Sequence, residues 1–129
     1  MPSYSISKTS MKSFKETVEA VKAALKQEGF GILTEIDVQQ KMKEKLDKEM
    51  DEYIILGACH PPSAYKAIQL EEQVGLFLPC NVIIYRSQKG GIMVGAIRPS
   101  IAMSMISNPD LNCVAKDVEE SMERVLSHI

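Results

Sequence analysis

The sequence predicts an α+β fold, a two-layer sandwich in which two long helices cover one face of an antiparallel sheet. One segment near the N-terminus and one at the C-terminus repeat apolar residues at helical spacing. The segments between them include short apolar runs rich in β-branched residues, which indicate strands. Two of these runs, 82–86 and 91–97, flank a glycine-containing turn that is typical of a hairpin. The expected order is strand, helix, four strands and helix (β-α-β4-α), with inserted short helices.

Length and composition indicate one ordinary soluble domain, spanning 1–129. The chain is 45% hydrophobic and 25% charged, with a formal charge of −2, which gives no basic excess for binding nucleic acid. No apolar run approaches the roughly 20 residues of a membrane helix, and the N-terminus lacks signal-peptide features. We therefore expect a cytoplasmic protein with no nucleic-acid or membrane partner. Its three cysteines, an odd number, are expected to be reduced thiols.

The N-terminal part of the chain is expected to form an edge strand followed by a capped helix. Polar and apolar residues alternate briefly over 3–7, as in a short edge strand. Ser13 and Glu16 have the spacing of a capping box, in which the two side chains satisfy free amides at a helix start. Gly29 can adopt the left-handed conformation that often ends a helix. These features predict a helix over 13–28.

A strand and an exposed inserted helix are expected next. Branched residues predict a strand over 31–36. The following segment, 38–50, begins at a second capping-box pattern and is rich in Lys, Glu and Asp, which indicates a solvated helix. It carries a narrow apolar stripe that is sufficient to dock it on another surface. The stripe consists of Met42, Leu46 and Met50.

The central strands are apolar on both faces. The strand 53–59 is followed by a short helix over 63–70, with Pro61 in its first turn. Turns of helix over 101–106 then precede a final helix that starts at Asn108 and has one apolar face. An antiparallel sheet that is wet on one side should alternate between apolar and polar residues more cleanly than these strands do. The inserted segments, a bound ligand or another subunit must therefore cover the second face.

Two motifs near the middle of the chain resemble a known family. Segments 57–67 and 75–82 read Gly-Ala-Cys-His-Pro-Pro-Ser-Ala-Tyr-Lys-Ala and Gly-Leu-Phe-Leu-Pro-Cys-Asn-Val. They are similar to the Gly-x-Cys-(Asn/His)-Pro-x-x-Ala-x-x-Ala and Gly-Leu-Leu-Leu-Pro-Cys-Asn-Val motifs of the domain-of-unknown-function 302 family. The resemblance extends over nearly the whole chain, although His60 stands where many members have Asn and Phe77 replaces a usual Leu. It implies a fold similar to the TATA-binding-protein type and, because the family has no assigned activity, no catalytic residues.

The candidate binding site lies where these motifs meet. Cys59 ends one predicted strand and Cys80 comes just before the next, so antiparallel pairing would make the two thiols neighbours. Together with His60 and Asn81 they form the site that we expect to bind a small molecule or a metal ion. Whether the site also catalyses a reaction stays open.

A metal ion is one candidate ligand for this site. Cys59, His60 and Cys80 offer three ligands that suit zinc or copper, Cu(I) in particular. Glu71 or Glu72 could supply a fourth. The spacing of these residues matches no standard zinc motif, and adjacent Cys59 and His60 could share one ion only if the backbone turns between them.

Two further interpretations stay open. In the first, the chain is a thiol-dependent redox or sulfur-transfer protein, with Cys59 as nucleophile and Cys80 as resolving thiol. Cys59 and His60 lie at the N-terminus of the predicted short helix, whose dipole and free amides would then lower the pKa of the Cys59 thiol. In the second, the cysteines pack as small hydrophobes and the chain is a structural module that dimerises through its second sheet face. We expect a homodimer.

Overall fold

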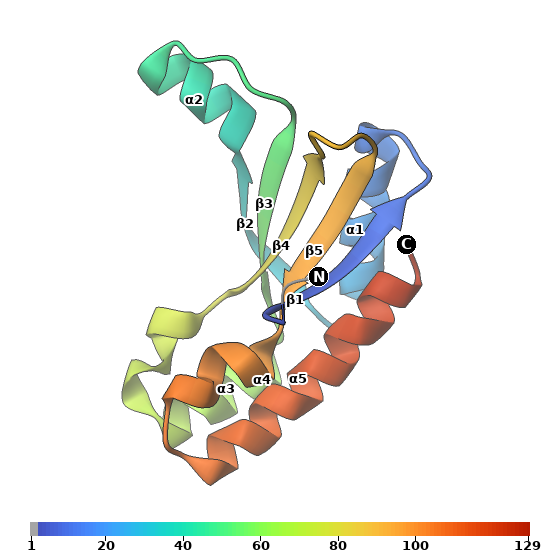
Figure 1. Ribbon diagram of the computed structural model, residues 1–129. Coiled ribbons are helices and arrows are strands. Elements are labelled where there is room, and N and C mark those ends of the chain that lie inside the picture. The colour runs from blue at the N-terminus through green and yellow to red at the C-terminus, as the bar shows by residue number, and fades with distance from the viewer. Residues whose placement is uncertain (1–2) are drawn as a thin grey trace.

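A computed structural model describes residues 3–129 and contains one antiparallel five-stranded sheet with the strand order β1-β5-β4-β3-β2 (Figure 1). The expected α+β class and element order are confirmed. The strands are β1 (Ser5–Ser10), β2 (Gly31–Asp37), β3 (Tyr53–Cys59), β4 (Cys80–Arg86) and β5 (Ile92–Ile97). The helices are α1 (Phe14–Gln27), α2 (Val38–Leu46), α3 (Pro61–Leu70), α4 (Pro99–Ala102) and α5 (Pro109–Ser127), with 3-10 helices η1 (Glu72–Phe77) and η2 (Met103–Met105).

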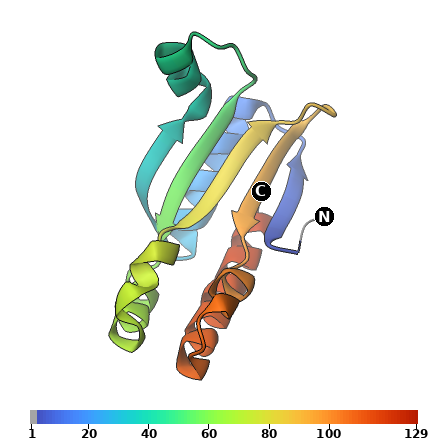
Figure 2. The same cartoon turned by 60° about the vertical axis from the view of Figure 1, so that its left-hand side comes forward.

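The two long helices, α1 and α5, cover one face of the sheet (Figure 2). Every second residue of the inner strands points into this layer, as strand geometry requires. The principal core consists of fully buried strand and helix residues, among them Leu56, Val82, Ile84, Val94, Val21, Leu25, Met122 and Val125. Within residues 3–129 no helix is both long and apolar enough to cross a membrane.

A second, smaller core lies under the N-terminal half of α5. The long helix therefore joins two packing units: its C-terminal half packs on the sheet, and its N-terminal half packs on α3, η1 and η2. The buried residues of the second core are Ala67, Val74, Met103, Leu111, Val114 and Ala115. The 3-10 helix η1 contributes Val74, which is fully buried in this core.

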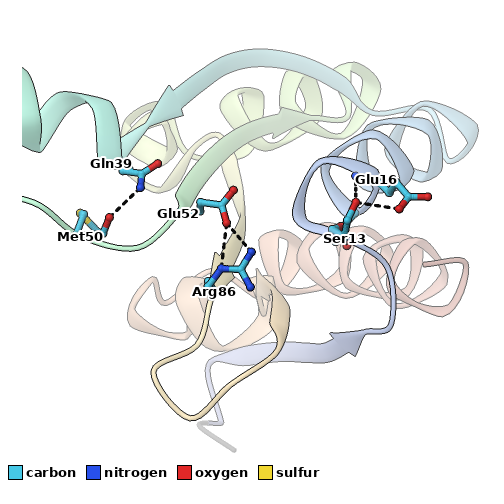
Figure 3. Close-up of polar contacts among 7 residues, drawn as sticks. Ser13, Glu16, Gln39, Met50, Glu52 and Arg86 are labelled. Atoms are coloured by element: carbon cyan, nitrogen blue, oxygen red, sulfur yellow. Dashed lines mark hydrogen bonds and ion pairs between the residues drawn. The ribbon is translucent and has the colours of Figure 1, made fainter.

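The first strand lies further along the chain than expected, because β1 pairs with the whole length of β5, from Ser5 opposite Ile97 to Ser10 opposite Ile92. Its position at the edge of the sheet is confirmed. The helix start is also confirmed: the Glu16 amide donates to Ser13 Oγ at 3.2 Å, and the Ser13 hydroxyl donates to the Glu16 carboxylate at 2.9 Å (Figure 3). Gly29 follows the helix with a φ of 83°.

The inserted helix α2 is shorter than expected. It ends at Leu46, where Asp47 adopts a left-handed conformation with φ 53°. The predicted helix over 38–50 is therefore too long, and its apolar residues do not form one continuous helical stripe. Leu46 is 62% exposed. The Gln39 side chain donates to the Met50 carbonyl at 2.9 Å and holds the returning segment against the helix start (Figure 3). Both overall views show α2 extending beyond the end of the sheet, away from α1 and α5.

Three other elements start two residues before their expected positions. Strand β4 starts at Cys80, because Ala58 and Gly57 of β3 pair with Cys80 and Asn81. Helix α3 starts at Pro61, and α4 starts at Pro99. Each proline occupies the first helical position, where an amide hydrogen would have no acceptor within the helix, so the lack of one costs nothing.

One carboxylate links α4 to α5. Glu119 accepts hydrogen bonds from Arg98 Nη1 at 3.0 Å, from the Ser100 amide at 3.0 Å and from the Ser100 hydroxyl at 2.5 Å. Its side chain is 13% exposed. Burial would raise the pKa of this carboxyl, but the hydrogen bonds from Ser100 and the charge of Arg98 together lower it below its usual value.

Candidate functional site

Three of the predicted site residues, Cys59, His60 and Cys80, line one small cavity. The end of β3 and the start of β4 form one wall, because Ala58 pairs with Cys80 in the sheet. Helices α3, α4 and α5 and the 3-10 helix η2 form the others. The cavity has a volume of about 30 Å³, and most of its lining is apolar. The apolar contributors include Ala64, Ala67, Leu78, Met103, Val114 and Ala115.

Cys80 is the buried thiol of the pair. Its side chain points from β4 into the core, and the residue is 7% exposed. Burial, together with the nearby Cys59, raises the pKa of the Cys80 thiol from 9.0 to about 11. An uncharged thiol is therefore the stable form of Cys80 at neutral pH.

The environment of Cys59 differs from the sequence-based expectation. Cys59 is partly exposed and lies next to His60, the N-cap residue of α3. The first two residues of that helix, Pro61 and Pro62, have no amide hydrogens, and the amide of Ala64 already donates to the His60 carbonyl at 2.9 Å. The expected set of free amides that would stabilise a thiolate is thus reduced, because proline supplies no donor.

His60 is held by residues that the sequence did not single out. Its Nδ1 lies 2.8 Å from the Ser63 hydroxyl. Its ring packs edge-on against Phe30, with the ring centroids 5.6 Å apart. A side chain at Gly29 would meet the same imidazole at 3.4 Å, so the turn between α1 and β2 closes over His60. The only sequence signal for this contact is Gly29 followed by Phe30, just after the end of α1.

Asn81 does not join the cavity. It is exposed on β4, where it pairs with Gly57, and adjacent strand residues face opposite sides of the sheet. The side chains of Cys80 and Asn81 therefore lie on opposite faces of the sheet, although the two residues are adjacent in the motif. The structure thus does not bring Asn81 together with Cys80 in this cavity.

The metal-ligand set is also not assembled. Across residues 3–129, no three His, Cys, Asp or Glu side chains are grouped so that they could hold a metal ion. Neither Glu71 nor Glu72 lines the cavity, so the expected fourth ligand is missing. These positions give no support to zinc or copper at this site.

A family model described as domain of unknown function DUF302 matches residues 6–129. The chain belongs to the DUF302 family. A crystal structure of an uncharacterized conserved DUF302 protein from Bacillus stearothermophilus is similar to this chain, with 29% sequence identity and a TM-score of 0.91. The alignment covers 98% of each chain. No curated protein matches the sequence.

The three thiols of this DUF302 chain are expected to react with iodoacetamide at very different rates. Cys113 is exposed, Cys59 is partly exposed and Cys80 is buried. With a pKa of about 11 in place of 9.0, Cys80 holds about one hundredth of the usual thiolate at neutral pH, because each pKa unit is a factor of ten. Peptide mass spectrometry over time should show Cys113 modified first and Cys80 last. Modification of Cys80 as fast as Cys113 would contradict this placement.

Proposed function

We propose that this domain binds a small molecule in the cavity lined by Cys59, His60 and Cys80. The observation that carries the proposal is that Cys59, His60 and Cys80 all line one otherwise apolar cavity. Ligand sites commonly combine a largely apolar lining with a few polar groups that orient the ligand. The Ser63 hydroxyl adds a fourth polar group beside the imidazole.

The cavity volume limits the ligand. About 30 Å³ accommodates no more than a few atoms, since one water-sized probe needs about 10–15 Å³. The proposed ligand is therefore a small, mainly apolar molecule, or a narrow apolar group of a larger one. Its single polar atom would contact His60 or a thiol at the edge of the cavity.

Native mass spectrometry of untagged protein, purified without chelator, tests this proposal. We expect a bound mass that disappears when the protein is denatured. Cys59→Ser and Cys80→Ser should reduce its occupancy, because each replaces a soft sulfur in the cavity wall with a smaller, more polar hydroxyl. Cys113→Ser is the matched control, since this exposed cysteine lies outside the cavity and should leave the bound mass unchanged.

Two results would refute the binding site. The first is a wild-type protein that carries no additional mass and whose melting temperature is unchanged by small apolar compounds. The second is a bound mass that all three serine variants retain equally. Either result would leave the structural role of the cysteines as the better explanation.

Thiol exchange is a second candidate, and one observation favours it. Cys59 and Cys80 line the same cavity, and Cys80 pairs with Ala58, the residue before Cys59. In this mechanism, the Cys59 thiolate attacks a low-molecular-weight disulfide, forms a mixed disulfide and releases one thiolate. Cys80 then loses its proton and displaces the second thiolate, which leaves a Cys59–Cys80 disulfide. The raised pKa slows this second step at neutral pH, so a persistent mixed disulfide on Cys59 is the expected product.

A further inference from the structure

The sheet face opposite α1 and α5, which we call the open face, carries two rows of apolar side chains, with Asn81 exposed on the same face of β4. Cross-strand pairing places Ile36, Ile55 and Ile83 in one row. It places Tyr53, Tyr85 and Met93 in the next row. The two tyrosine rings stack with their centroids 5.5 Å apart. None of the helices in residues 3–129 covers these rows (Figure 2).

Two positions on the open face carry no side chain. Gly57 and Gly95 belong to it, and neither has a side chain that would project from the sheet. The neighbouring side chains fill the space: Thr34 lies over Gly57, and Ile83 lies beside Gly95. An apolar face on an antiparallel sheet is suited to packing against another sheet.

We propose that a second copy of this chain covers the open face, so that the protein is a homodimer with two sheets packed face to face. The two-fold axis would run parallel to the strands, over the middle strand β4. In that arrangement β3 of one protomer lies over β5 of its partner, and the same ends of the two sheets meet. With the axis over β4, β3 faces β5 because these two strands flank β4 on opposite sides.

The charges at one end of the open face fit this symmetry. A groove of about 1100 Å³ lies there, between the segment that enters β3 and the turn that joins β4 to β5. Arg86 and Glu52 pair with each other at its edge, with the closest atoms 2.7 Å apart (Figure 3). Asp51 lines one wall and Lys89 the other, and neither forms an ion pair within residues 3–129. The two-fold axis exchanges these walls, so Asp51 of each protomer would face Lys89 of its partner.

The area of the face indicates that α2 takes part. Five strands at a spacing of about 4.8 Å, each about six residues long at about 3.3 Å per residue, present about 480 Å². A stable interface buries about 800 Å² on each partner. Helix α2 extends beyond the same end of the sheet and exposes Leu46, so its contact with the partner would supply the remaining area. A single dimer interface would thus cover both the open face and the exposed side of α2.

A charge exchange tests the arrangement directly. We expect sedimentation equilibrium to give a wild-type mass of about twice 14.3 kDa at micromolar concentration. Asp51→Lys and Lys89→Asp should each weaken dimerisation about tenfold or more, because like charges then face each other. An equimolar mixture of the two variants should dimerise again, since both contacts in the mixed dimer join a lysine to an aspartate. Both positions are exposed, so the variants should fold normally.

Substitutions on the two surfaces complete the test. Ile83→Glu should give a folded monomer, and Leu46→Glu should weaken the dimer if α2 takes part. Leu76→Glu is the control, because Leu76 is 80% exposed on η1, away from the open face. Three outcomes overturn the proposal: a monomeric wild type, a dimer that Ile83→Glu leaves intact, or a mixture of charge variants that does not regain dimers. The cavity proposal is unaffected by any of them, since it rests on the opposite side of the sheet.

Discussion

Replacing Glu119 with alanine is expected to lower the free energy of unfolding at pH 7 by about 2–3 kcal/mol, because hydrogen bonds to a charged group are each worth about 1.5–3 kcal/mol and are not additive. Glu119 accepts three of them, from Arg98 and Ser100. The substitution leaves the Ser100 amide without its acceptor. Glu123 lies 4.0 Å from Arg98 and can compensate part of the lost charge. Urea unfolding followed by circular dichroism measures the difference.

The same contact makes stability depend on pH. The pKa of Glu119 is lower in the folded chain than its usual value of 4.5, so the folded state favours the charged carboxylate. This contribution to stability is complete above pH 4.5 and is lost as the pH falls through the lowered pKa. Wild-type protein should therefore lose more stability between neutral and acidic pH than Glu119→Gln, which has no titrating group at this position.

Glu120 provides the matched control. It is the next residue on α5 and is exposed. Glu120→Ala should change the free energy of unfolding by less than about 0.5 kcal/mol, as is usual for an exposed surface position. Equal effects of the Glu119 and Glu120 substitutions would show that the link between α4 and α5 contributes nothing to stability.

Adding a single methyl group at Gly57 is expected to destabilise the fold by about 1–3 kcal/mol, the usual cost of overpacking a well-packed site. A Cβ atom at this position would overlap Thr34 Oγ1 and lie 2.9 Å from Pro79 Cγ. Strands β2 and β3, or the segment before β4, would have to move apart. Thermal unfolding of Gly57→Ala measures the cost as a lowered melting temperature.

Two further variants isolate the cause. Gly75→Ala adds the same methyl group where no atom lies within 4 Å, so it should be nearly neutral. Thr34→Ala removes the overlapping hydroxyl, and combining it with Gly57→Ala should recover part of the lost stability. If the double variant is no more stable than Gly57→Ala alone, steric overlap with Thr34 is not the cause.

Local sequence patterns predicted the bounds of an element correctly where those bounds depend on residues within or next to that element. The helix start at Ser13, the stop at Gly29 and the hairpin between β4 and β5 depend on caps and turns that act over a few residues. Two of the errors lie where a neighbouring strand decides the boundary. Pairing with β5 carries β1 to Ser10, and pairing with β3 brings Cys80 into β4.

The candidate site was only partly predictable for the same reason. The antiparallel pairing of β3 and β4 placed Cys59 and Cys80 together, as the sequence indicated. The alternation of strand side chains separated Asn81 from them, because Cys80 had not been assigned to the strand. The contact of Phe30 with His60 joins segments 30 residues apart, and no local pattern records it.

The sequence by itself determined the fold class, the order of the elements, the family motifs and the position of the two central cysteines. These properties follow from hydrophobic periodicity, capping residues and turn residues, which act over short distances along the chain. Only the tertiary structure decided the raised pKa of Cys80, the size of the cavity and the face on which Asn81 lies. Burial and the direction of each side chain depend on contacts between distant segments, and those contacts exist only once the sheet and the helices have packed together.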